Sequence, residues 1–199
     1  MNLSRRRFIG AVAAGTTGLV APRASAIVRT GPQPALLARA MAALQVHGNS
    51  IVHRDLIGIV DFGAPSRSPR FQLVDVGNGR VLTSLLVSHG RGSDPANLGW
   101  VQRFSNVPGS NASSNGSFLT GDTYRGKHGL SRRLRGLDPE NSLALQRAIV
   151  IHGANYVDRD MAMTQGRIGR SQGCFAFAEE DIRLVLSRLG DGRLLFAAR

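Results

Sequence analysis

The chain has 199 residues and a formal net charge of +12 at pH 7, with 25 basic residues against 13 acidic ones. Its length allows one domain with a substantial core and is short for two. Lys127 is the only lysine, and the arginines are dispersed among glycine, serine and apolar residues, which disfavours a nucleic-acid-binding arm. Such a surface attracts anionic polymers or lipid head groups, unless the arginines only reflect a compositional bias.

The first 26 residues have the organisation of an export signal. Three arginines at 5–7 and Phe8 are followed by a run of small and apolar residues over 10–21, and 24–26 supplies a small-residue cleavage site. Paired arginines followed by Phe8 match the twin-arginine type of signal, and the run is shorter than the roughly 20 residues of a spanning helix. We therefore predict that residues 1–26 are a twin-arginine signal peptide, that the chain is exported to the periplasm, and that it is not stably inserted in a membrane after cleavage.

A helix and a hairpin are predicted in the first half of the remaining chain. Apolar residues recur at helical spacing over 34–47, so we assign residues 27–50 to an N-terminal helical segment and residues 51–199 to the main domain. The next apolar and β-branched runs predict strands, with Gly77, Asn78 and Gly79 as the hairpin turn between the last two. These runs are 51–62, 71–76 and 81–87.

The second half opens with a long segment rich in serine, asparagine, glycine and proline, residues 90–117. Because it contains Trp100 and Phe104, and disordered segments are poor in aromatic residues, we expect a functional loop. Further along, patterning predicts two helices and two strands. These are helices at 139–148 and 178–189, a buried strand at 149–151 and a closing strand at 194–198. The sum is an α+β domain, mostly β, with helices at its margins.

Cys174 is the only cysteine, so it can form no internal disulfide. In an oxidising compartment an unpaired thiol persists only if it is buried, shielded or used. The preceding residues 170–173 are polar and flexible, typical of a surface turn, whereas inert core cysteines usually sit inside apolar runs. The context favours a reactive thiol over a packed one.

A thiol nucleophile needs a base or a cationic neighbour, and the usual partner is a histidine. His152 directly follows an apolar run and precedes Gly153, so we expect it at the end of a central strand, aimed into a cleft. His89 has the same setting before Gly90. A lone histidine after a strand is more often structural, but two in matching contexts, together with an exposed-looking cysteine, favour a catalytic role for His152.

Gly173, immediately before the cysteine, also has a mechanistic interpretation. A residue without Cβ lets the backbone approach a substrate carbonyl, so the N–H groups of Gly173 and Cys174 could form an oxyanion hole. A plain turn glycine is the alternative.

These residues resemble the signature of the YkuD-type L,D-transpeptidases, a His-Gly pair followed downstream by Ser-x-Gly-Cys. Here the motif is His152 and Gly153, then Ser171, Gln172, Gly173 and Cys174. The resemblance runs from about residue 56 to 196 and is strongest to the murein L,D-transpeptidase catalytic domain branch. It implies that 51–199 is a catalytic β-sandwich or barrel-like domain with short flanking helices, acting on peptidoglycan stem peptides without a metal or organic cofactor.

The resemblance also implies roles for individual residues. Cys174 would attack the carbonyl of the L-centre of a diamino acid, expel the terminal D-amino acid and hold the stem as a thioester. An acceptor amine would then give a cross-link, whereas water would give L,D-carboxypeptidase action. His152 would take the thiol proton and later activate the acceptor, oriented by the backbone of Ser171 or the side chain of His89.

The resemblance leaves the substrate contacts less defined. The Arg or Asn found shortly after the cysteine in better-known members is absent, so Arg170, Lys127 and Arg91 become the candidates to hold the carboxylate of the donor stem. Tyr124, Lys127 and His128 lie in a family-like segment and are expected to line the groove. Phe175 stands where this branch commonly has proline, and we expect it to reshape the pocket floor.

Two other interpretations compete with the enzyme. His89, His128, His152 and Cys174 are the right ligand types for zinc, although their spacing fits no compact ligand motif. A catalytically silent domain that binds wall polymer through its arginines is the second, because resemblance in fold does not prove activity.

Overall fold

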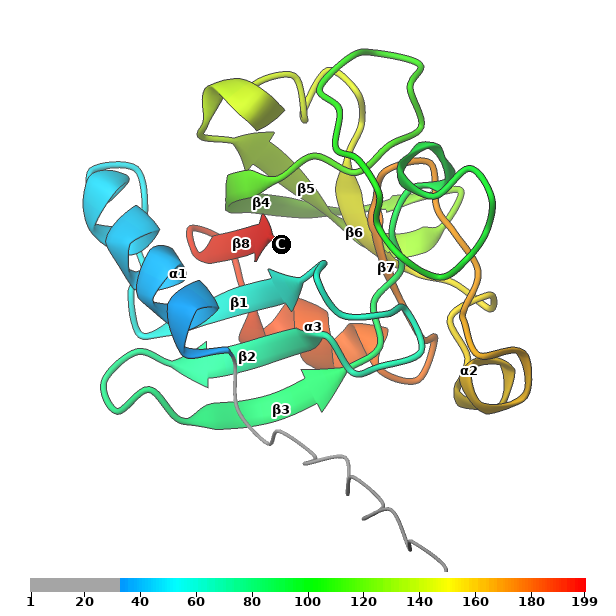
Figure 1. Cartoon of the computed structure of the whole chain (residues 1–199). Coiled ribbons are helices and arrows are strands. Elements are labelled where there is room, and N and C mark those ends of the chain that lie inside the picture. The colour runs from blue at the N-terminus through cyan, green and yellow to red at the C-terminus, as the bar shows by residue number, and fades with distance from the viewer. Residues whose placement is uncertain (1–32) are drawn as a thin grey trace, which may run out of the picture.

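A computed structural model describes residues 33–199, so the predicted signal peptide at 1–26 lies outside the described residues. A single sheet of eight strands forms the frame, in the order β3-β2-β1-β8-β4-β5-β6-β7 (Figure 1). The strands are β1 (Leu56–Asp61), β2 (Phe71–Asp75), β3 (Val81–Leu85), β4 (Gly116–Gly126), β5 (Gly129–Gly136), β6 (Val150–Gly153), β7 (Phe175–Phe177) and β8 (Leu194–Ala198). The helices are α1 (Pro34–Val46), α2 (Arg159–Gln165) and α3 (Ile182–Arg188).

The sheet curls until its two ends approach each other. Phe71 in β2 packs edge to face on Phe177 in β7, with ring centroids 4.9 Å apart, although β2 and β7 lie near opposite ends of the strand order. Just beyond β3, the N–H of Ser88 donates a 2.9 Å hydrogen bond to the carbonyl oxygen of Ala176 in β7. The prediction of a mostly β, barrel-like domain with short flanking helices is confirmed.

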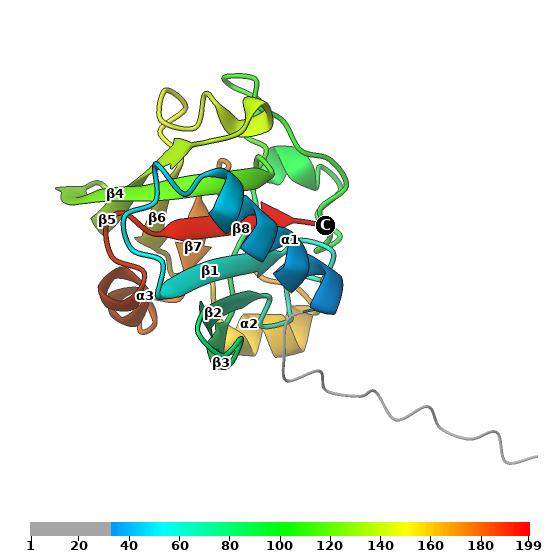
Figure 2. The same cartoon turned by 90° about the vertical axis from the view of Figure 1, so that its left-hand side faces the viewer.

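Strand β8 lies at the centre of the sheet, parallel to β1 and antiparallel to β4. All five of its residues are buried, because the curled core covers one face and α1 covers the other (Figure 2). Leu36, Ala40 and Leu44 form the buried stripe of α1, at the four-residue spacing of one helix face. Burying each leucine contributes about 1.5–3 kcal/mol.

The expected hairpin of β2 and β3 is confirmed. The two strands pair antiparallel, and Gly79 adopts φ +68° in the turn, a conformation that glycine accepts without strain. The carboxylate of Asp75 accepts a 2.8 Å hydrogen bond from the N–H of Gly77 and so stabilises the turn. The first predicted strand, 51–62, is shorter in the structure because β1 begins only at Leu56.

The helix predicted over 139–148 is wrong. Only a single 3-10 turn forms, Pro139–Asn141, followed by irregular turns. The amide of Asn141 donates to the carbonyl oxygens of Asn115 and Ser117 (3.0 and 2.9 Å), which ties this segment to the start of β4. Side-chain hydrogen bonds of this kind compete with helix formation. The predicted helix at 178–189 is correct in type but begins later, at Ile182.

The long polar segment is confirmed as a loop up to the start of β4 at Gly116, with one short 3-10 turn at Arg91–Ser93. Within residues 33–199, no helix has the length and apolar character needed to cross a bilayer.

Candidate active site

Two neighbouring parallel strands bring Cys174 and His152 to the same face of the sheet. His152 in β6 pairs with Ala176 in β7, and Cys174 lies two residues before Ala176. Because side chains alternate along a strand, these three point to one side. The intervening residues point to the other side, into the curled core. They are Ile151, Phe175 and Phe177.

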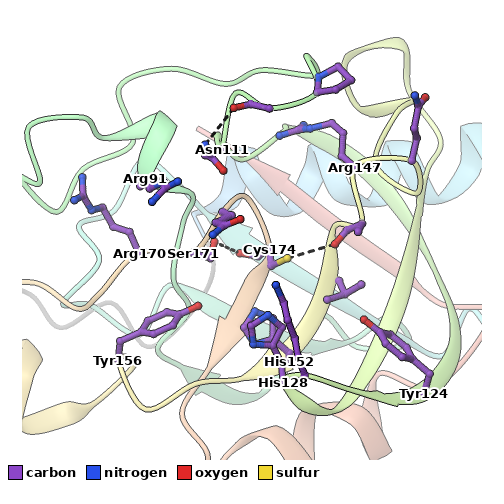
Figure 3. A pocket seen from close by; sticks show the side chains of 17 residues that line it. Arg91, Asn111, Tyr124, His128, Arg147, His152, Tyr156, Arg170, Ser171 and Cys174 are labelled. Carbon is purple, nitrogen blue, oxygen red and sulfur yellow. Dashed lines mark hydrogen bonds between the residues drawn. The ribbon is translucent and has the colours of Figure 1, made fainter.

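His152 and Cys174 line one cavity of about 660 Å³, whose walls come from segments far apart in the sequence (Figure 3). The loop after β3, the hairpin of β4 and β5, and the segments flanking β6 all contribute. Every predicted substrate contact lies on this wall: Arg91, Tyr124, Lys127, His128 and Arg170. The loop 90–117 contributes through Arg91, Pro108, Gly109 and Asn111, in keeping with the expected functional loop.

The thiol of Cys174 is partly buried, and burial raises its pKa. A hydrogen bond from the backbone of Val150 and the positive charges of Lys127 and Arg147 act in the opposite direction but do not outweigh burial. The cationic neighbours therefore lower the thiol pKa without bringing it below its ordinary value. The sulfur rests as a thiol, so a base must remove its proton during attack.

His152 is suited to be that base. Its Nδ1 lies 2.8 Å from the carbonyl oxygen of Gly153, and since a carbonyl only accepts, Nδ1 carries the proton and Nε2 is left as an acceptor. Burial lowers the pKa of His152, and the charges of His128 and Lys127 lower it further. The ring is therefore neutral at neutral pH and can accept a proton.

His128, from the turn between β4 and β5, stacks on His152 with ring centroids 4.3 Å apart and planes 22° apart. This contact places a side chain of the hairpin turn directly against the proposed base in the cavity wall (Figure 3). Burial and the charge of Lys127 lower the pKa of His128 as well, so the two rings stack as neutral groups at neutral pH, and His128 becomes charged only in acid.

Ser171 shapes the turn around the cysteine instead of orienting His152. Its hydroxyl donates to the carbonyl oxygen of Cys174 at 2.7 Å and accepts from the N–H of Gly173 at 3.1 Å. The Gly173 N–H is thus already engaged, and the predicted oxyanion hole loses that donor. Of the two N–H groups named in that prediction, only the one of Cys174 is left to serve it. The orienting partner of His152 is the carbonyl of Gly153.

His89 is sealed inside the molecule and contacts neither His152 nor the cavity. Its Nδ1 accepts from Arg70 at 2.7 Å, and its Nε2 lies 3.3 Å from Asp94. Burial, and next the charge of Arg70, lower the pKa of His89 to about 4. Its expected role in orienting His152 therefore does not match its position. Only its backbone reaches the site, where the His89 carbonyl accepts a 2.9 Å hydrogen bond from the N–H of Ser171.

Phe175 does not form the pocket floor. It is buried on the core side of β7, stacked on Phe62 at 6.0 Å and edge to face with Phe118 at 5.3 Å. The expectation that it reshapes the pocket is wrong, because strand alternation turns its side chain away from Cys174.

Arg147 is a site residue that sequence reasoning missed. Its guanidinium donates to the carbonyl oxygens of Ser105 (2.6 Å) and Ala112 (2.5 Å), and to two serine hydroxyls. Its positive charge lowers the pKa of Cys174. Within residues 33–199, Arg147 forms no ion pair with a carboxylate. Its position two residues before the predicted buried strand 149–151 is the available signal, but the helix predicted over 139–148 includes it. Tyr156, where burial raises the pKa to about 12, was also missed on this wall.

The family model of the L,D-transpeptidase catalytic domain matches residues 30–198. The chain belongs to this family. The resemblance inferred from the His-Gly and Ser-x-Gly-Cys motifs is thereby confirmed. No curated protein matches the chain.

Several solved structures are similar at low identity. An L,D-transpeptidase from Mycobacterium smegmatis is 13% identical with a TM-score of 0.45, over 73% of this chain and 59% of that one. The L,D-transpeptidase from Xylanimonas cellulosilytica is 15% identical with a TM-score of 0.44, over 79% and 68%. The cell shape determining protein Pgp2 from Campylobacter jejuni is 11% identical with a TM-score of 0.49, over 84% and 57%. The chain thus spans about three fifths of the length of the mycobacterial structure.

The four side chains proposed as zinc ligands do not meet at one site, because His89 lies away from the cavity that the other three line. Within the described part of the chain, no group of three or more histidine, cysteine or acidic side chains is arranged to hold a metal ion. His89 in particular is held by Arg70 and Asp94, away from the cavity.

Proposed function

We propose that the chain is a peptidoglycan L,D-transpeptidase that forms a thioester between Cys174 and a stem peptide and transfers the stem to an acceptor amine. The observation that carries this proposal is the placement of Cys174 and His152 on one face of β6 and β7, lining one cavity, in a chain of the L,D-transpeptidase family. We propose further that residues 1–26 direct export to the periplasm.

In the acylation step, Nε2 of His152 takes the thiol proton as the sulfur attacks the carbonyl carbon of the L-centre. The C–N bond to the terminal D-amino acid then breaks, and His152 returns the proton to the leaving amine. The charges of Lys127 and Arg147 stabilise the sulfur as negative charge develops on it. The product is a thioester on Cys174.

In the second step the acceptor amine attacks the thioester carbonyl, His152 removes a proton from that amine, and Cys174 leaves and recovers a proton. Water in place of the amine would make the same site an L,D-carboxypeptidase. The neutral resting state of His152 suits both steps, because a protonated ring would accept no proton.

A carbapenem tests the proposal, because its strained lactam carbonyl is an acyl donor for a reactive thiol. We expect one covalent adduct on the signal-free protein by intact-mass spectrometry and none on Cys174→Ser. His152→Gln should slow acylation on the order of 10² to 10⁴-fold. Ser187→Ala, which changes an exposed side chain on α3, is the matched control.

Folded wild-type protein that stays unmodified would contradict the enzyme and favour the catalytically silent wall-binding domain. An adduct that persists on Cys174→Ser would contradict Cys174 as the acylated residue. Products from purified tetrapeptide stems then separate the two enzymatic outcomes. Cross-linked dimers support the transpeptidase, and tripeptides alone support the carboxypeptidase.

A further inference from the structure

A second cavity, of about 320 Å³, adjoins the Cys174 cavity and shares Arg91 and Arg170 with it. Its third basic residue is Arg167, which follows the end of α2. The two cavities therefore meet at Arg91 and Arg170. The second cavity continues from there to a third arginine, Arg167.

The positive charge of this three-arginine group is not neutralised by the protein. Neither cavity is lined by any aspartate or glutamate, and no ion pair within residues 33–199 involves Arg91, Arg167 or Arg170. In the described part of the chain, the side chain of Arg167 donates only to the carbonyl oxygen of Gln165, at 3.4 Å, and that of Arg170 only to the carbonyl oxygen of Asp94.

The carboxylate of Asp94, whose backbone carbonyl accepts from Arg170, is turned inward. It is fully buried and accepts from the N–H groups of Leu98 (2.9 Å) and Gly99 (2.8 Å), and it lies 3.3 Å from His89. Its oxygens are thus engaged within the protein and do not pair with the three guanidinium groups.

The backbone that carries these arginines is held at both ends. The N–H of Arg91 donates to the carbonyl of Ser171 at 2.8 Å, which joins it to the turn that carries Cys174. The N–H of Ile168 donates to Ser66 at 3.2 Å, and that of Gly169 to the carbonyl of Tyr156 at 2.7 Å. The arginines therefore project from a backbone fixed relative to the nucleophile.

We propose that Arg91, Arg167 and Arg170 form an anion subsite that binds a second carboxylate of the donor stem, carried by a residue other than the one acylated. Guanidinium groups bind carboxylates through paired hydrogen bonds, and three of them lining one cavity from two fixed segments favour an anion over a neutral amide. The inference rests on the proposed function, because that function supplies an extended peptide with several carboxylates.

Calorimetry on Cys174→Ala protein, which needs no turnover, tests the subsite. The probes are a tetrapeptide stem and forms of it in which each non-reacting carboxylate is converted singly to a carboxamide. We expect one amidated form to bind roughly tenfold more weakly than the parent stem. Adding Arg167→Gln should weaken the parent stem by a similar factor and abolish the difference between the two ligands. Added salt should weaken the parent stem more than the amidated form.

Arg188→Gln, at an exposed arginine near the end of α3 and outside both cavities, is the matched control. The inference is overturned if the parent stem does not bind, if every amidated stem binds as well as the parent, or if Arg167→Gln and Arg188→Gln have equal effects. Carbapenem acylation of the wild type tests the proposed function separately. Failure of the anion subsite can therefore be distinguished from failure of the proposed function.

Discussion

Gly173 lies so close to Ala112 that a Cβ built on the glycine would be 2.7 Å from the Ala112 carbonyl oxygen. Its φ of +113° is also a conformation that residues with a side chain rarely adopt. The residue directly before the nucleophile is therefore restricted to glycine by both backbone conformation and space.

Gly173→Ala should displace the turn that carries Cys174. We expect a loss of about 1–3 kcal/mol in the free energy of unfolding, together with a fall in carbapenem acylation rate that exceeds the loss of folded protein. Gly79→Ala is the matched control, because Gly79 has φ +68° but only one ordinary contact, at 4.0 Å. Equal acylation rates for both variants would show that space at Gly173 is unimportant.

His128→Ala should raise the pKa of His152. The stacked ring helps to bury His152, and its own protonation in acid opposes protonation of His152. Both effects hold the pKa of His152 down, so their removal moves the acid limb of the acylation rate to higher pH. At pH 6 more of the imidazole is then protonated, and we expect acylation to fall about two- to fivefold relative to pH 8. NMR titration of the His152 ring and a pH–rate profile measure the shift.

His128→Phe and Lys127→Met separate the effect of burial on the pKa of His152 from the effect of nearby charge. Phenylalanine keeps a stacked ring without its charge, while Lys127→Met removes the other nearby charge. An acid limb that stays in place in His128→Ala would show that the stacking has no electrostatic role.

Arg147→Met should affect both stability and thiol chemistry. The loop carbonyls of Ser105 and Ala112 lose their donor, which should cost about 2–4 kcal/mol in the free energy of unfolding. The pKa of Cys174 should rise further, because one of the two charges that lower it is gone. Thermal unfolding and the pH dependence of thiol alkylation measure the two effects.

Arg147→Lys keeps the charge but not the forked geometry. We expect it to preserve the alkylation profile better than the folding stability. If Arg147→Met alkylates with the wild-type pH dependence, the guanidinium is purely structural.

His89 should make the protein less stable in acid. In the folded state its pKa is about 4, and in the unfolded chain it returns to about 6.5. Between about pH 6.5 and pH 4 the unfolded state thus binds more protons than the folded state. The free energy of unfolding therefore falls progressively as the pH is lowered, and the loss is complete near pH 4. It amounts to roughly 3 kcal/mol for this group.

Urea unfolding of wild type and His89→Gln between pH 4 and 7.5 isolates this contribution. The variant should be less stable at pH 7.5, because Arg70 and Asp94 lose their partner, but its stability should depend less steeply on pH. An identical slope in the two proteins would contradict the buried neutral histidine.

Features that depend only on the local sequence pattern could be predicted from the sequence. The turn glycines between β2 and β3, the amphipathic spacing of α1 and the order of the His-Gly and Ser-x-Gly-Cys motifs are all local features. They sufficed for the fold class, the family and the choice of Cys174 and His152 as the pair to examine. The polar hairpin of β4 and β5, the three residues of β7 and the short α2 were missed, because brief or solvent-facing segments carry little periodicity.

Contacts across the closed sheet were decided only by the tertiary structure. His89 and His152 follow apolar runs in the same way, yet one is sealed against Arg70 and Asp94 while the other faces the cavity. The placement of Arg147 beside Cys174 depends on a loop some 35 to 42 residues earlier in the chain. Sequence order specifies which side chains a strand can present, but which of them meet depends on how the sheet closes, and that is set by packing between residues distant in the chain.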